Sequence, residues 1–280
     1  MKIIDYRNYF IQTLTPLYDA AEAESFFYLI LEHQTGMKRI DLALDRDREF
    51  SQTEIETWNP ILEQLKQFVP IQYIIGTTEF FGLEFEVNPN VLIPRPETEE
   101  LVQWILSNNP NGNVKILDIG TGSGCIAISL AKNLPDAQVS AIDVSEEALE
   151  TAKRNAQRNE TKVNFIQRNI LQTENLEETF DIIVSNPPYV RNLEKEEIKK
   201  NVLEHEPHLA LFVDDHDALL FYRKIADLAL QNLSPKGQLY FEINQYLGKE
   251  MMDLLEQKGF SQLELRADIY GNHRMVFGRI

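Results

Sequence analysis

The sequence has one cysteine, no long apolar run, and fewer basic than acidic residues. Because Cys125 has no second cysteine to pair with, an intramolecular disulfide framework is excluded, and a reducing compartment is expected. The apolar runs are too short for a transmembrane helix, and charge soon interrupts the N-terminus, unlike a signal peptide. The composition therefore predicts a soluble, cytoplasmic protein without a membrane partner.

Basic residues are scarce: 27 Lys and Arg stand against 44 Asp and Glu, a net charge of −17. Proteins that grip nucleic-acid backbones usually present basic stripes. Here basic residues gather only in short patches such as 195–200, where acidic residues interrupt them. We therefore expect no direct nucleic-acid partner, although net charge alone does not exclude a local basic face.

The 280 residues predict about two domains, at roughly 150 residues each. Residues 1–72 carry apolar side chains at the helical period, and Gly36 is a plausible helix stop. Ser51 and Glu54 have the spacing of a capping box that opens a further helix. This region is predicted to be a helical N-terminal domain that serves packing or substrate docking. The protein as a whole is expected to be a monomer.

Residues 73–94 predict a β-hairpin linker, with strands at 80–87 and 91–93 around a turn at 88–90. The last predicted domain comprises residues 95–280. From residue 114 onward its strands and helices alternate, which is typical of a parallel sheet with helices on both faces. The expected strands are 114–118, 139–143, 163–167, 181–185 and 238–243, followed by two strand-like segments at 262–266 and 275–280.

A glycine-rich loop follows the first of these strands, where a ligand meets the carboxyl end of a sheet. It consists of Gly120, Thr121, Gly122, Ser123 and Gly124. The dinucleotide fingerprint has its third glycine one position later, to accommodate a pyrophosphate. Asp143, at the end of the next strand, is placed to accept hydrogen bonds from a ribose diol. A nucleoside without pyrophosphate, such as S-adenosylmethionine, therefore fits better, and a plain turn is the alternative for the loop alone.

Three further residues bear on this predicted cofactor site. Asn169 follows the third strand, where its side-chain oxygen could accept from an adenine amine, and Ile170 could cover a ring face. Both can equally be ordinary loop residues. Cys125 is expected to be a small core residue, although a helix N-terminus could depress its pKa.

The tetrapeptide Asn186, Pro187, Pro188 and Tyr189 directly follows the fourth strand. Consecutive prolines present carbonyls without competing N–H groups. The Asn186 amide and the Pro187 carbonyl therefore make a set of acceptors for a planar –NH2 group, and Tyr189 adds an aromatic face. A rigid turn that merely ends the strand is the alternative for the tetrapeptide alone.

With these residues, the whole chain resembles the release factor glutamine methyltransferase family, class I enzymes that use S-adenosylmethionine. The resemblance covers the helical N-terminal domain, the hairpin, and the motifs Leu92–Glu99, Gly120–Gly124, Asn186–Tyr189, Glu206–Leu211 and Asp268–Arg274. It implies a Rossmann-like, seven-stranded sheet with one antiparallel strand, which suits residues 274–280. At the position matched to Asn169, relatives often carry Asp.

The resemblance implies methylation of the side-chain amide nitrogen of glutamine in the Gly-Gly-Gln motif of peptide chain release factors. Gly120–Gly124, Asp143 and Asn186 then bind S-adenosylmethionine, with Asn169 and Ile170 near the adenine. Asn186, Pro187, Pro188 and Tyr189 bind the glutamine, and Asn186, Pro187 and Tyr189 serve catalysis. Orientation of the amide is expected to supply most of the rate enhancement. The motif contains no convincing general base, so proton loss is expected to follow methyl transfer.

Other candidates carry less weight. His205 and His208 have i, i+3 spacing, but Pro207 interrupts the helix that a metal pair needs, so no metal is expected. Arg95 could close the cofactor pocket or serve as a structural hinge, and Arg274 could contact substrate or pair with Asp268. The rival functions are glutamine methylation on a ribosomal protein, DNA adenine methylation, and a non-catalytic adaptor role.

Overall fold

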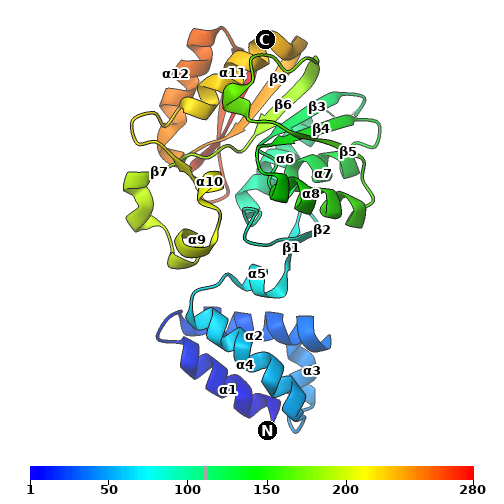
Figure 1. Ribbon diagram of the computed structural model, residues 1–280, viewed down its shortest axis with the longest axis vertical. Helices are drawn as coiled ribbons and strands as arrows, with labels where there is room; N and C mark the ends of the chain where they lie inside the picture. Colours follow the sequence, from blue (N-terminus) through cyan, green and yellow to red (C-terminus); the bar gives the residue numbers. More distant parts are fainter. Residues whose placement is uncertain (110–111) are drawn as a thin grey trace. The chain divides into compact units, whose positions relative to one another are not determined.

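The chain divides into two compact units in a computed structural model that describes residues 1–109 and 112–280 (Figure 1). Unit 1 comprises Met1–Gly76 with Lys200–His205, and unit 2 comprises Thr77–Lys199 with Glu206–Ile280. Among the described residues, the helices are all too short or too polar to cross a membrane.

Unit 1 is built of helices, with one isolated antiparallel bridge between Lys2 and Glu49. Its helices are α1 (Ile3–Leu14), α2 (Ala20–Thr35), α3 (Arg39–Leu44), α4 (Gln52–Lys66), α5 (Ile71–Ile75) and α9 (Lys200–His205). The predicted capping box is confirmed, since the Ser51 hydroxyl accepts from the Glu54 N–H and Glu54 accepts from the Ser51 N–H. Gly36 ends α2 in the left-handed conformation, with φ of 71°. The predicted helix stop is therefore also confirmed.

The core of unit 1 is an aromatic cluster around Trp58 on α4. The rings of Tyr6, Phe10, Phe27 and Phe50 lie 5.0–6.0 Å from the Trp58 ring, centroid to centroid. All five side chains are buried. Such packing gives this helical unit an apolar core of its own.

A β-hairpin opens unit 2, but the predicted strand positions are partly wrong. Strands β1 (Thr77–Phe80) and β2 (Leu83–Glu86) pair around a two-residue turn at Phe81 and Gly82, both with positive φ. Consecutive positive φ angles match the twist of a tight hairpin, so the chain reverses here and not at residues 88–90. Residues 91–93 form no strand and instead line a cavity described below.

The large sheet of unit 2 confirms seven strands, one of them antiparallel. They are β3 (Lys115–Ile119), β4 (Gln138–Asp143), β5 (Val163–Gln167), β6 (Phe180–Ser185), β9 (Leu233–Glu242), β10 (Ser261–Ala267) and β11 (His273–Arg279). Their order is β10-β11-β9-β6-β3-β4-β5, and β11 runs antiparallel to both of its neighbours. A separate short parallel pair joins β7 (Val190–Arg191) and β8 (Phe212–Val213).

Helices cover both faces of this sheet (Figure 1). They are α6 (Pro96–Asn108), α7 (Cys125–Asn133), α8 (Glu146–Arg158), α11 (Leu220–Asn232) and α12 (Gly248–Lys258). The shorter helices are α10 (His208–Leu211), η1 (Ile170–Gln172), η2 (Asn192–Glu197) and η3 (Gln245–Leu247). Along β6, Ile182 and Val184 belong to the core shared with α6 and α7, whereas Ile183 belongs to the core shared with α11 and α12. The strand is apolar on both faces because both are buried.

The strand order changes direction at β3. From β3 the chain continues to β4 and β5 on one side, and it then returns to β6 on the other side of β3. Ligands bind at such a switch point, outside the carboxyl ends of the parallel strands.

Candidate functional site

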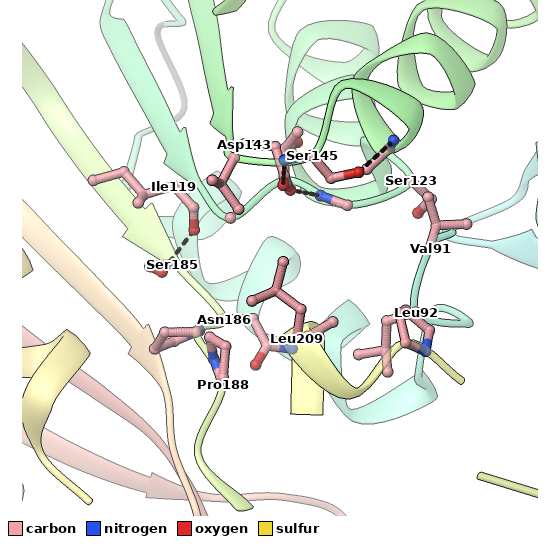
Figure 2. Close-up of a pocket in the computed structure, with 18 of the residues that line it drawn as sticks. Val91, Leu92, Ile119, Ser123, Asp143, Ser145, Ser185, Asn186, Pro188 and Leu209 are labelled. Atoms are coloured by element: carbon pink, nitrogen blue, oxygen red, sulfur yellow. Dashed lines mark hydrogen bonds between the residues drawn. The ribbon is translucent and has the colours of Figure 1, made fainter. Parts of the chain in front are cut away.

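A cavity of about 260 Å³ lies at the carboxyl ends of β3, β4 and β6 (Figure 2). Its lining includes most of the residues that the sequence singled out: Gly120, Thr121, Gly122, Ser123, Cys125, Asp143, Asn169, Ile170, Asn186, Pro187 and Pro188. These residues come from four separate loops, which the parallel sheet brings to one edge.

The glycine-rich loop bends sharply as it leaves β3. Gly120 and Gly122 have φ of 77° and 54°, and no atom lies within 4 Å of where a side chain would begin at either residue. The N–H groups of Gly120 and Thr121 both donate to the Ile142 carbonyl on β4, at 2.8 and 3.0 Å. Bare backbone therefore forms this part of the cavity wall, which lets a ligand approach closely.

Gly124 does not line the cavity, although the sequence predicts it as a cofactor contact. Its φ is 84°, and an added Cβ would lie 2.8 Å from the Ile128 side chain and 3.1 Å from that of Ala152. The glycine instead allows α7 to begin in close contact with α8.

Asp143 is held by two backbone donors at the end of β4. Its Oδ2 accepts from the Gly122 N–H at 2.8 Å, and its Oδ1 accepts from the Ser145 N–H at 3.0 Å (Figure 2). Each carboxylate oxygen has a further lone pair. Asp143 therefore combines a fixed orientation with spare acceptor capacity at the cavity.

Asn169 and Ile170 lie on the cavity wall after β5. The Asn169 side-chain oxygen accepts from the Leu171 N–H at 3.0 Å, which starts the short helix η1. Ile170 is buried and lines the same wall. The arrangement offers one amide and one apolar surface side by side.

The tetrapeptide begins where β6 ends. Ser185, the last residue of β6, donates its hydroxyl to the Ile119 carbonyl at 2.7 Å, which ties β6 to β3 just before Asn186 (Figure 2). Asn186, Pro187 and Pro188 line the cavity. Tyr189 does not, and its hydroxyl donates to Glu242 at 3.3 Å. Burial raises the pKa of Tyr189, so its phenol is a neutral donor near pH 7.

Cys125 lines the cavity at the start of α7, but the helix N-terminus does not activate it. Burial, followed by the nearby Asp118 carboxyl, raises the pKa of the Cys125 thiol to about 12. Its thiolate is therefore scarce at neutral pH.

Two buried glutamates at this edge of the sheet were given no role by the sequence reasoning. Glu206 accepts from the Arg95 guanidinium at 2.6 Å and from the Ile93 N–H at 3.2 Å, and its side chain is 1% exposed. Arg95 is thus paired within the cavity wall. Glu242 ends β9 and accepts from the Thr98 hydroxyl at 2.6 Å as well as from Tyr189. Burial raises the pKa of Glu242. The sequence signal that could have found Glu242 is an acid directly after the apolar run 239–241.

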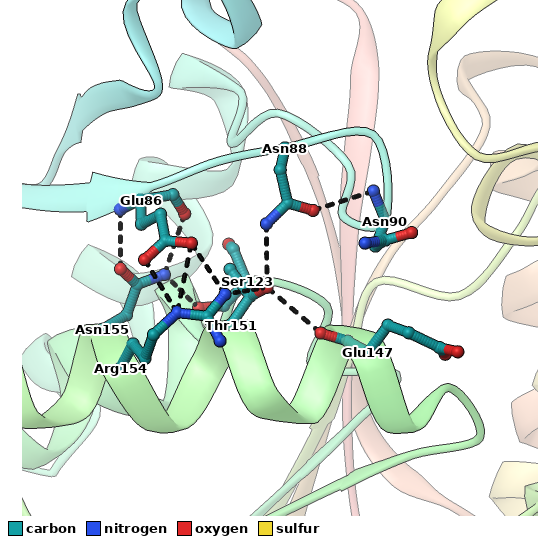
Figure 3. A network of polar contacts seen from close by, with 8 residues as sticks. All are labelled: Glu86, Asn88, Asn90, Ser123, Glu147, Thr151, Arg154 and Asn155. Atoms are coloured by element: carbon teal, nitrogen blue, oxygen red, sulfur yellow. Dashed lines mark hydrogen bonds and ion pairs between the residues drawn. The ribbon is translucent and has the colours of Figure 1, made fainter.

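Hydrogen bonds connect α8 to the segment after β2 and to the glycine-rich loop (Figure 3). The fully buried Asn155 accepts from the Glu86 N–H and donates to the carbonyls of Glu86 and Ser123. Asn88 donates to Thr151 at 3.0 Å. One helix therefore fixes both the segment after β2 and the glycine-rich loop.

Near the C-terminus, Arg274 donates to Asp268 at 3.4 Å. Of the two sequence-based interpretations of Arg274, the structure shows the pairing with Asp268. Asp268 also accepts from the backbone N–H groups of Tyr270 and Asn272 at 3.0 and 2.9 Å, so it organises the turn between β10 and β11.

Comparison with known proteins places the chain. Residues 5–76 match the family model described as "PrmC N-terminal domain", and residues 97–210 match "Methyltransferase small domain". A release factor glutamine methyltransferase of Flavobacterium psychrophilum is 62% identical over 280 residues, 99% of this chain and 98% of the relative. One of Bacteroides thetaiotaomicron is 45% identical over 269 residues, 96% of each chain. This chain belongs to the release factor glutamine methyltransferase family.

The fold of this family member also resembles solved methyltransferases. A methyltransferase from Pyrococcus furiosus superposes with a TM-score of 0.53 at 23% identity, over 71% of this chain and 90% of the other. At this identity the likeness shows the fold alone. Together with the seven-stranded sheet, it confirms the predicted class I methyltransferase architecture.

Proposed function

We propose that this methyltransferase uses S-adenosylmethionine to methylate the side-chain amide nitrogen of glutamine in the Gly-Gly-Gln motif of peptide chain release factors. One observation carries the proposal. Asn186 and Pro187 line the same cavity as the glycine-rich loop and Asp143. A site for a planar –NH2 group and a site for a nucleoside therefore share one chamber.

The cavity residues fit S-adenosylmethionine. Asp143 keeps free lone pairs for a ribose diol, the backbone at Gly120 and Gly122 leaves room for close approach, and Asn169 with Ile170 offers a surface for adenine. When bound, S-adenosylmethionine supplies a methyl group activated by a positively charged sulfur.

The protein's own contribution is orientation of the glutamine amide. An amide nitrogen is a weak nucleophile because its lone pair is delocalised into the carbonyl. The Asn186 side-chain oxygen and the Pro187 carbonyl accept from the two N–H bonds, which directs the nitrogen and favours its pyramidal form. Alignment of this kind supplies up to about 7–11 kcal/mol in well-oriented reactions. The amide proton then passes to water after the carbon–nitrogen bond forms, so no side chain serves as a general base.

We further propose that residues 1–72 dock the release factor and that residues 95–280 catalyse methyl transfer. Residues 73–94 link these two domains. Unit 1 supports this with a separate aromatic core of its own. We propose that the protein acts as a cytoplasmic monomer, without metal, nucleic acid or membrane as a partner.

The test is transfer of labelled methyl from S-adenosylmethionine to release factors from the same organism. Parallel reactions contain a Gly-Gly-Ala release factor, ribosomal proteins and duplex DNA. We expect label on the release factor and none on the Gly-Gly-Ala variant. Label only on ribosomal protein or DNA would overturn the assigned substrate, and cofactor binding without any label would favour the adaptor role.

A further inference from the structure

Glu242 connects two segments that flank the proposed substrate site. Its carboxylate accepts from the Thr98 hydroxyl through Oε2 at 2.6 Å and from the Tyr189 hydroxyl through Oε1 at 3.3 Å. Thr98 itself lines the cavity, and Tyr189 ends the tetrapeptide whose first three residues line it. One carboxylate therefore holds a wall residue from α6 and the end of the loop after β6.

The position of Glu242 is set by the sheet. It is the last residue of β9 and pairs with Met275 on β11, while its neighbour Phe241 pairs with Ser185 at the end of β6. The Glu242 carbonyl also accepts from the Tyr222 hydroxyl at 3.1 Å. Glu242 is buried, with 1% of the residue exposed, and is held in place at the level of the strand ends.

We propose that Glu242 is a positioning residue that orients Tyr189, and through it the amide-binding loop, for methyl transfer. This inference rests on the proposed function. A tyrosine side chain has two torsions, so anchoring its hydroxyl at a fixed acceptor restrains both. The Tyr189 carbonyl also accepts from the Asn244 amide at 3.4 Å, which leaves the loop held at both backbone and side chain.

A carboxylate suits this task better than an amide of the same shape. Each of the two Glu242 side-chain oxygens accepts from a hydroxyl, an arrangement that needs two acceptor oxygens on one side chain. In Glu242→Gln, one oxygen becomes an NH2 group, which can only donate. The Thr98 hydroxyl, at 2.6 Å, keeps the remaining oxygen, so the Tyr189 hydroxyl faces the NH2 group and loses its carboxylate acceptor. The substitution keeps the volume and replaces the Tyr189–carboxylate bond with a weaker, neutral bond in which the tyrosine accepts.

The experiment is a double-mutant cycle on kcat with Glu242→Gln and Tyr189→Phe, using methyl transfer to the release factor. We expect each single variant to lower kcat by about tenfold. The double variant should lose no more than about twofold beyond either one, because both substitutions remove the bond between the Tyr189 hydroxyl and the Glu242 carboxylate. The dissociation constant for S-adenosylmethionine should stay within about twofold of wild type, since Glu242 does not line the cavity.

Asp181→Asn is the matched control. Asp181 lies near the other end of β6 and accepts from the Lys115 N–H at 2.8 Å and the Ser234 hydroxyl at 2.6 Å. Any loss it causes should multiply with that of Tyr189→Phe. Multiplicative losses for Glu242→Gln and Tyr189→Phe, or an unchanged kcat in Glu242→Gln, would overturn the inference.

Two further readouts keep the outcome decisive. If Glu242→Gln does not fold, a cycle of Thr98→Val with Tyr189→Phe replaces it, because both hydroxyls share one carboxylate and their losses should be coupled. Independent losses in that cycle would equally refute the positioning role. If the wild-type enzyme transfers no label to a release factor, the proposed function fails. If the wild-type enzyme transfers label but the losses in the two single variants are independent, only the role of Glu242 is rejected.

Discussion

Asn186 stands where the central strand β6 ends and the cavity begins. Because Ser185 already ties this strand end to β3, the fold does not depend on the Asn186 side chain alone. The amide is thus available to the ligand, which is the property expected of a residue that recognises an –NH2 group.

We therefore expect Asn186→Ala to keep the wild-type fold and lose methyl transfer by about 100-fold or more, the usual effect of removing a group that stabilises the transition state. Steady-state methylation kinetics and a thermal melt measure the two properties. Asn164→Ala, at an exposed position on β5, is the control and should retain activity. Wild-type turnover by Asn186→Ala would refute the assigned role.

At the scale of elements, the glycine-rich loop shows two different uses of the same residue type. Gly120 and Gly122 leave open space at the cavity, whereas Gly124 lies against the side chains of Ile128 and Ala152. The first two serve ligand approach, and the third serves the packing of α7 on α8.

Gly124→Ala should therefore destabilise the protein more than Gly259→Ala. Both glycines have positive φ, of 84° and 94°, but no atom lies within 4 Å of an added Cβ at Gly259. Gly259→Ala should cost about 1–2 kcal/mol for the left-handed backbone. Gly124→Ala should cost roughly 1–3 kcal/mol more because it overpacks the core. Urea denaturation measures both variants, and equal losses would contradict the packing role.

For the whole molecule, one buried carboxyl group couples stability to pH. Asp118 is fully buried at the end of β3. Burial first, and the charge of Asp143 in addition, raise its pKa from 3.8 to about 7, although a hydrogen bond from Thr121 partly opposes this. Near neutral pH the fold therefore holds a proton that the unfolded chain has already released.

This sets the sign of the pH dependence. The contribution of Asp118 is complete below its unfolded pKa of 3.8 and is lost as pH rises through its folded pKa of about 7. Between about pH 5 and about pH 8, wild type should lose more free energy of unfolding than Asp118→Asn, which has no such proton. Denaturant titrations of both proteins across this range test the prediction, and parallel pH profiles would contradict it.

Local sequence patterns were sufficient to predict those elements whose structure depends on residues close together in the chain. Strand β5 is found at 163–167 as predicted, because a short, largely apolar run between polar segments is a pattern of neighbouring residues. The capping box of α4 is likewise a contact over three residues. The hairpin was misplaced because Phe81 takes a positive φ that its residue type does not predict.

The sequence alone determined the helical first domain, the alternating sheet domain, and the loops that meet at the cavity, since periodicity, turn residues and motif spacing are local properties. Only the tertiary structure decided that Gly124 packs a helix, that Arg95 pairs with Glu206, and that Glu242 holds Tyr189. The Thr98–Glu242 bond joins residues 144 positions apart. Contacts of this range depend on which strands become neighbours, and that follows from packing the whole sheet between its helices.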